Sequence, residues 1–114
     1  MSGYLTTHVL DTARGCPAAG VVIWLYKVTG NSHKKIAELV TNDDGRTDGP
    51  ILAEARFVTG EYELVFHAGD YLRVTGQPDG FLNQIPIRFT MSEASHYHVP
   101  LLLSPFGYST YRGS

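Results

Sequence analysis

The chain has 114 residues and a formal net charge of −2, and its nine basic and eleven acidic side chains are scattered, which excludes the charged surface that nucleic acid or an anionic membrane would need. This length suits one domain, residues 1–114, with a core of its own, and no apolar run approaches the ~18 residues of a membrane span. A single cysteine, Cys16, excludes an internal disulfide, and because the start Met-Ser-Gly-Tyr lacks the features of a secretory signal, we expect a cytoplasmic protein.

Residues 4–10 are rich in β-branched and aromatic side chains and predict the first strand. Alternate residues of a strand point to opposite faces, so Leu5 and Val9 share one face and His8 lies on the other. A loop with the glycine and proline residues of a chain reversal follows at 11–20.

Residues 21–29 and 34–41 form two further predicted strands, and the turn Gly30-Asn31-Ser32 joins them in a hairpin. The alternation of the second of these strands is imperfect. Residues 42–50 hold so many turn-forming residues that we expect an irregular, exposed loop. Arg46 follows a turn glycine in this loop, and loops on a rigid scaffold often carry functional residues.

The middle of the chain predicts one short helix between two strands. Residues 61–67 alternate strongly, as expected of a central strand, and residues 85–91 alternate again. Between them, Asp70 is expected as the N-cap of a short helix that Gly76 terminates. With the closing strands, the sequence predicts seven or eight strands and one helix, which is the profile of an antiparallel β-sandwich.

The last nineteen residues predict two strands joined at a tight corner. Over residues 97–103 one face is apolar, whereas the opposite face carries His96 and His98. Such a face suits contact with a ligand or another subunit better than contact with solvent. Pro86 and Pro100 fall within predicted strands, which must therefore be edge strands or irregular at those points.

Taken alone, no histidine or cysteine of the sequence predicts a specific reaction. Zinc needs three or four ligands, and Cys16 has no second cysteine to join it, so we expect no metal site. We expect His33 and His67 to be surface or capping residues, and a histidine pair such as His96 and His98 is most often merely solvated. No nucleophile elbow, phosphate-binding loop or dinucleotide fingerprint is present.

Three segments carry a resemblance to a known family. They are Leu5-Thr-Thr-His-Val-Leu-Asp-Thr-Ala-Arg-Gly-Cys-Pro-Ala18, Asp43-Asp-Gly-Arg-Thr, and the closing His96-Tyr-His-Val-Pro-Leu-Leu-Leu-Ser-Pro with Tyr108-Ser-Thr-Tyr-Arg-Gly-Ser114. Together they resemble the 5-hydroxyisourate hydrolases of the transthyretin family. The terminal Tyr-Arg-Gly-Ser is the specific part, because it separates the hydrolases from the hormone-carrying transthyretins.

The resemblance implies an all-β, transthyretin-like antiparallel sandwich of two four-stranded sheets, assembled as a homotetramer with active sites in a channel where dimers meet. It implies hydrolysis of 5-hydroxyisourate to 2-oxo-4-hydroxy-4-carboxy-5-ureidoimidazoline in urate degradation, without cofactor or metal. The residues matched to the family's motifs as catalytic are His8, Arg46, His98 and Ser114. Those matched as substrate-binding are Tyr111, Arg112 and Gly113.

This set of side chains suits the implied reaction. A histidine that is neutral near pH 7 can take a proton from water, an arginine can stabilise the oxyanion, and a second histidine can protonate the leaving nitrogen. We favour His98 as the base and expect Arg46 to stabilise the oxyanion. We expect Ser114 to act through its hydroxyl or a terminal carboxylate, Gly113 to leave room for substrate, and Tyr111 either to narrow the channel or to pack against a neighbouring subunit.

The sequence is also compatible with two other functions. One is a transthyretin-type carrier that binds a small ligand without turnover, although His8, His98 and Arg46 make the channel more polar than a carrier channel should be. The other is a purely structural or interaction domain.

Overall fold

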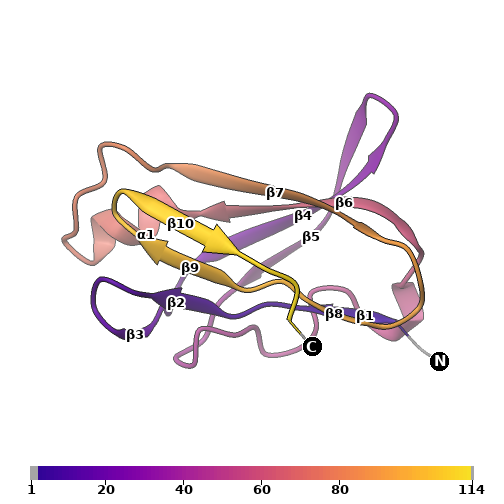
Figure 1. The fold of residues 1–114 in the computed structure, drawn as a ribbon, viewed down its shortest axis with the longest axis horizontal. Coiled ribbons are helices and arrows are strands. Elements are labelled where there is room, and N and C mark those ends of the chain that lie inside the picture. The colour runs from indigo at the N-terminus through magenta and orange to yellow at the C-terminus, as the bar shows by residue number, and fades with distance from the viewer. Residues whose placement is uncertain (1–2, 114) are drawn as a thin grey trace.

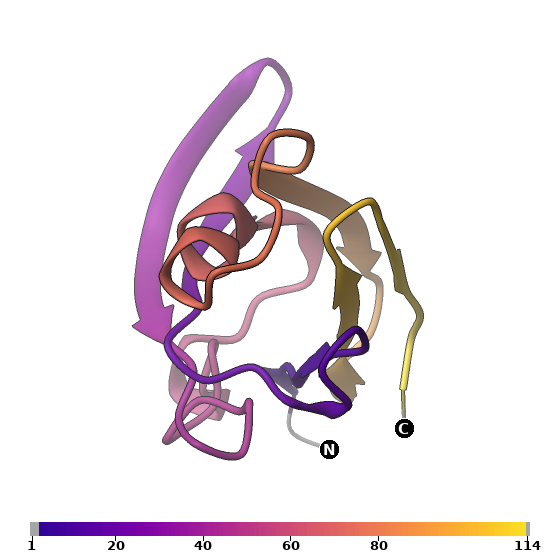
Figure 2. The ribbon, with the colours of Figure 1, turned by 90° about the vertical axis from the view of Figure 1, so that its left-hand side faces the viewer.

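The computed structural model describes residues 3–113, which form two four-stranded β-sheets packed face to face, a two-stranded sheet and one short α-helix (Figure 1). The strands are β1 (Tyr4–Thr6), β2 (Val9–Asp11), β3 (Cys16–Pro17), β4 (Val22–Thr29), β5 (Ser32–Val40), β6 (Gly60–His67), β7 (Gln84–Met91), β8 (His96–His98), β9 (Leu101–Ser104) and β10 (Gly107–Thr110). A 3-10 turn, η1 (Glu54–Arg56), precedes β6, and the helix α1 (Ala68–Val74) follows it. Figure 2 views the sandwich from the end that carries α1.

The two four-stranded sheets have the strand orders β5-β4-β6-β7 and β10-β9-β2-β3, and β1 and β8 form a separate two-stranded sheet. This confirms the predicted all-β sandwich of two four-stranded sheets. The second of these four-stranded sheets is mixed, however, and not antiparallel throughout, because β2 runs parallel to β9. The strands of the two-stranded sheet, β1 and β8, are also parallel. Side-chain alternation is the same in both directions, so the sequence pattern could not reveal the direction of pairing.

Both prolines that the sequence places within strands lie where a missing N–H breaks no ladder, as predicted. Pro86 is in β7, an edge strand, and Pro100 lies in the gap between β8 and β9, which divides the strand predicted at 97–103. The first strand is divided opposite this gap. The carbonyl oxygens of Thr6 and His8 accept backbone hydrogen bonds of 3.0 and 2.9 Å there, so the two strands stay paired across it.

The core lies between the sheets and follows the alternation of the strands. Leu5 and Val9 are fully buried, whereas His8 is only partly buried on the other face, as predicted. The later strand buries alternate residues in the same way: Tyr97, Val99, Leu101 and Leu103. Burial of each large aliphatic side chain is worth about 1.5–3 kcal/mol, and a one-residue slip would turn this set outward. The core therefore determines which side chains reach the outer face.

The helix differs at its start from the prediction. It begins at Ala68, so Asp70 lies in its first turn and its carboxylate accepts a hydrogen bond of 2.9 Å from Arg73 instead of capping the N-terminus. Gly76, with φ of 72°, follows the last turn as predicted. No helix within residues 3–113 is long and apolar enough to cross a membrane.

The β4–β5 hairpin explains the imperfect alternation of its second strand. A β-bulge shifts the register between Leu25 and Tyr26, so the neighbouring residues Ile36 and Ala37 both pack against the core. The turn is shorter than predicted, since Ser32 already pairs with β4.

Candidate functional site

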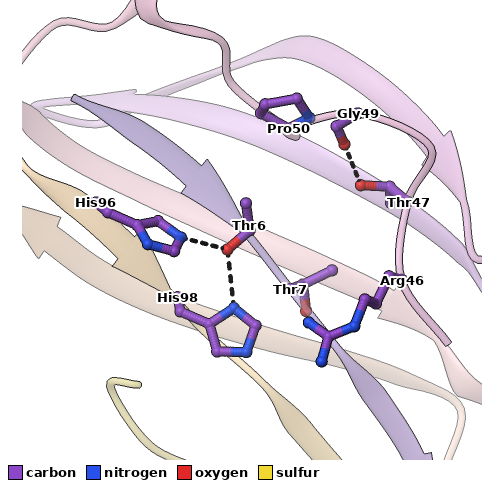
Figure 3. Close-up of a pocket in the computed structure, with 8 residues that line it drawn as sticks. All are labelled: Thr6, Thr7, Arg46, Thr47, Gly49, Pro50, His96 and His98. Atoms are coloured by element: carbon purple, nitrogen blue, oxygen red, sulfur yellow. Dashed lines mark hydrogen bonds between the residues drawn. The ribbon is translucent and has the colours of Figure 1, made fainter. Parts of the chain in front are cut away.

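The outer face of β1 and β8 gathers polar and aromatic side chains around one hydroxyl. The parallel register sets Tyr4 opposite His96 and Thr6 opposite His98. The hydroxyl oxygen of Thr6 lies 2.7 Å from Nε2 of His96 and 2.8 Å from Nδ1 of His98, as Figure 3 shows. The ring of Tyr4 stacks on His96 with the centroids 4.1 Å apart. The two imidazoles are thus linked through one side chain of the neighbouring strand.

Two hollows adjoin this face. The first, of about 440 Å³, lies between β1, β8 and the loop 42–50, and its lining comprises Thr6, Thr7, Arg46, Thr47, Gly49, Pro50, His96 and His98. The second, of about 780 Å³, shares His96 and His98 and is otherwise lined by Tyr111, Arg112 and Gly113. Side chains from three distant parts of the sequence therefore meet at His98.

The backbone of the irregular loop 42–50 determines where Arg46 lies. Gly45 has φ of 75°, and its carbonyl oxygen accepts a hydrogen bond of 2.8 Å from the N–H of Val9 in β2. A Cβ at this position would collide with the carbonyl oxygen of Val9, so only glycine fits. The side-chain oxygen of Asn42 also accepts a hydrogen bond of 3.3 Å from the N–H of Arg46. The loop is thus fastened to the sheet directly before Arg46.

His8 lies in the gap between β1 and β2, next to this loop. Its neighbours Thr7 and Val9 are buried, so its side chain is on the outer face, and its Cδ2 lies beside Gly45. It does not line either hollow, but it is close enough to His98 to contribute to the lowering of the His98 pKa.

Burial and repulsion from neighbouring basic side chains lower the pKa of His98 below its ordinary value of 6.5. Burial acts most strongly, because the charged imidazolium loses hydration, and repulsion from Arg46, His96 and His8 adds to it. His98 is therefore neutral at pH 7, which a group that takes a proton from water must be.

The C-terminal segment returns to β8 after β10 ends at Thr110 (Figure 1). The N–H of Gly113 donates a hydrogen bond of 2.7 Å to the carbonyl oxygen of His98. A Cβ on Gly113 would lie only 2.6 Å from Cδ2 of the His98 ring, so this position has no room for a side chain.

The other residues of the terminal motif surround the second hollow. The guanidinium of Arg112 lies over the ring of Tyr97, 4.3 Å from its centroid, and donates a hydrogen bond of 3.3 Å to the Ser95 hydroxyl. Tyr111 is 59% exposed. Neither residue belongs to a strand, so the second of the two strands predicted in the last nineteen residues ends at Thr110. The prediction for Ser114 lies outside the described residues.

The sequence patterns predict no role for Thr6 or His96. The alternation of the first strand does place Thr6 on the face of His8, which was the available signal. Its partners lie about ninety residues later, and no local pattern links them to it. Within residues 3–113 no three His, Cys, Asp or Glu side chains are grouped to hold a metal ion, and Cys16 lines neither of the two hollows.

The chain is similar in sequence and in structure to several known proteins. Residues 5–113 match the model of a family described as the HIUase/Transthyretin family. The 5-hydroxyisourate hydrolase of Mesorhizobium japonicum is 61% identical over 115 residues, covering 98% of this chain and 93% of that protein. The crystal structure of an (S)-allantoin synthase has a TM-score of 0.91 and 45% identity over 99% of this chain, which spans 44% of that longer chain. Sea bream transthyretin in complex with thyroxine has a TM-score of 0.88 at 28% identity, covering 96% of this chain and 93% of that one.

Proposed function

The chain belongs to the HIUase/transthyretin family, and we propose that it hydrolyses 5-hydroxyisourate to 2-oxo-4-hydroxy-4-carboxy-5-ureidoimidazoline in urate degradation. The observation that carries this proposal is the meeting of Arg46 with a neutral His98 at one hollow. The name of the relative from Mesorhizobium japonicum, which is 61% identical, supports the choice of substrate.

In the proposed reaction His98 acts as the general base. Its Nε2 removes a proton from water while the water oxygen forms a bond to a carbonyl carbon of the substrate ring. The carbonyl oxygen becomes an oxyanion, which the guanidinium of Arg46 stabilises. The ring C–N bond then breaks, and a protonated His8 gives its proton to the leaving nitrogen. The new carboxylic acid ionises, and exchange with solvent returns both histidines to their starting states.

The terminal motif is proposed to bind the substrate from the second hollow. Tyr111, Arg112 and Gly113 line that hollow together with His98, which supports this assignment. Gly113 leaves room for the His98 ring and for the substrate. Ser114 is proposed to act beside them.

We also propose that residues 1–114 form one hydrolase domain that assembles as a cytoplasmic homotetramer, with the outer face of His8 and His98 lining a channel between subunits. The likeness to the transthyretin family supports the assembly. Light scattering of the purified protein tests it, and a monomer would contradict the channel.

The proposed activity is tested by generating 5-hydroxyisourate from urate with a urate oxidase and following the decay of its transient absorbance. We expect the purified protein to accelerate the decay and the variant His98→Asn to lose this effect. His33→Asn, on the exposed β5 strand of the other sheet, is the matched control and should retain activity. An unchanged decay with folded wild-type protein would contradict the proposal.

A small-ligand carrier is the second candidate, because the fold matches a transthyretin solved with thyroxine. A carrier site should be mostly apolar, whereas His98 and Arg46 line the first hollow here. Binding of an aromatic hormone without any hydrolysis of 5-hydroxyisourate would favour the carrier. If the protein neither binds such a hormone nor hydrolyses 5-hydroxyisourate, the remaining candidate is a structural or interaction domain.

A further inference from the structure

The hydroxyl of Thr6 lies within hydrogen-bond distance of two imidazole nitrogens, Nε2 of His96 and Nδ1 of His98. A hydroxyl has one proton to donate and two lone pairs that accept. Thr6 can therefore donate to only one ring, and the nitrogen of the other ring must carry the proton of its bond. The tautomers of the two histidines are coupled through this hydroxyl.

We propose that Thr6 and His96 are positioning residues that hold His98 in the tautomer whose Nε2 is free to accept a proton. In this arrangement Nδ1–H of His98 donates to the oxygen of Thr6, and the hydroxyl of Thr6 donates to Nε2 of His96. This inference rests on the proposed role of His98 as the general base, and the structure adds how that role is prepared.

The chemistry of the base selects this direction of the two bonds. The hydrogen bond with Thr6 engages Nδ1 of His98, so only Nε2 is left to contact the water molecule. A neutral imidazole carries one proton, and Nε2 is a base only if that proton is on Nδ1. In the reverse direction, His96 would donate to Thr6 and Thr6 to His98, so Nε2 of His98 would carry the proton and could only donate.

The same direction suits the protonated state of His98. An imidazolium donates from both nitrogens, so the bond from Nδ1 to Thr6 is kept when Nε2 takes a proton. The hydrogen bonds need no rearrangement during the step, which is the condition for preorganised catalysis.

His96 is held in place as the final acceptor. Its ring lies parallel to that of Tyr4, with an interplanar angle of 5°. The stacked ring keeps Nε2 directed at Thr6, 2.7 Å away. Nε2 of His96 must be unprotonated in this arrangement, because a protonated ring nitrogen has no lone pair with which to accept the hydrogen bond from Thr6.

The tautomer is measured directly by ¹⁵N NMR of the imidazoles in the substrate-free protein. We expect the proton of neutral His98 on Nδ1 in the wild type. In Thr6→Val, which keeps the shape and loses the hydroxyl, both tautomers should be populated. Thr6→Ser should restore the wild-type state. A wild-type His98 with its proton on Nε2, or an unchanged tautomer in Thr6→Val, would overturn the inference.

Kinetics provides the second test. Thr6→Val should lower kcat about tenfold with KM little changed, as expected for the loss of one hydrogen bond, and Thr6→Ser should recover most of it. His96→Phe keeps an aromatic ring for Tyr4 but removes the acceptor, and should cause a similar loss. Thr29→Val, at the exposed end of β4, is the matched control. Wild-type kcat in both Thr6→Val and His96→Phe would overturn the inference.

The two experiments separate this inference from the proposed function. If the wild type holds the proton on Nδ1 but does not hydrolyse 5-hydroxyisourate, the hydrogen-bond assignment is supported and only the proposed reaction is contradicted.

Discussion

The backbone of Gly113 lies against the ring of His98. Its N–H donates to the carbonyl oxygen of His98 at 2.7 Å, and an added Cβ would lie 2.6 Å from Cδ2 of the ring. The terminal motif therefore determines where the imidazole can lie, in addition to lining the second hollow.

Gly113→Ala should displace the His98 ring, because the new methyl group and Cδ2 cannot both keep their places. A displacement of about 1 Å in a catalytic group can cost about 100-fold in rate, so we expect kcat to fall by this order. Steady-state kinetics measures it. Gly107→Ala is the control, since the nearest atom to its added Cβ is 3.8 Å away. Full activity of Gly113→Ala would show that the ring has more freedom than its contacts indicate.

Arg46→Gln should change both the rate and its pH dependence. Loss of an oxyanion donor is expected to lower kcat about 100-fold or more. Arg46 also lowers the pKa of His98, so its removal should raise that pKa. The acid limb of kcat/KM, expected below pH 6.5 in the wild type, should therefore move to higher pH.

The control for this variant is Arg73→Gln, which removes an exposed charge from α1, away from β1 and β8 (Figure 1). An acid limb that stays in place in Arg46→Gln would argue against His98 as the base.

Gly45→Ala should destabilise the protein and lower its activity together. The left-handed backbone at φ of 75° costs a non-glycine residue about 1–2 kcal/mol, and the methyl group would press on the carbonyl oxygen of Val9. The loop would have to move, and Arg46 with it. Thermal denaturation and kcat measure the two effects. Gly80→Ala is the control and should change neither quantity, because no atom lies within 4 Å of its added Cβ. A wild-type kcat in Gly45→Ala would show that the position of this loop does not affect catalysis.

Tyr71→Phe should destabilise the fold in a pH-dependent way. The hydroxyl of Tyr71 in α1 donates a hydrogen bond of 2.6 Å to the buried carboxylate of Asp11 in β2. Burial raises the pKa of Asp11, but hydrogen bonds from Tyr71, Arg14 and Gln77 outweigh it and lower that pKa below 3.8. A carboxylate with a lowered pKa stabilises the fold above its unfolded pKa, and this stability is lost as the pH falls through the folded pKa.

The loss in Tyr71→Phe should be about 1.5–3 kcal/mol at pH 7, as for a hydrogen bond to a charged group, and should be smaller at an acid pH well below 3.8, where Asp11 is protonated. Thermal denaturation at both pH values measures the difference. Tyr26→Phe on β4 is the control. A difference that does not depend on pH would mean that the charge of Asp11 is not what Tyr71 stabilises.

The sequence by itself determined the layers and faces of the molecule. Alternation placed Leu5 and Val9 in the core and His8 and His98 outside it, and both strand prolines lie where a missing N–H is tolerated. These features depend on residues one or two positions apart, because a strand turns each successive side chain to the other face. The end of the helix at Gly76 is likewise a local property of the backbone.

Only the tertiary structure decided which of those faces meet and how their side chains bond. The parallel register that sets Thr6 opposite His98 and the contact of Gly113 with the His98 ring join segments far apart in the chain. Such pairings follow from the burial of a shared core, which fixes the register of strands that no local pattern relates. The outward position of His98 was therefore readable from the sequence, whereas its hydrogen-bonded partners and its lowered pKa came only from the packing of the whole chain.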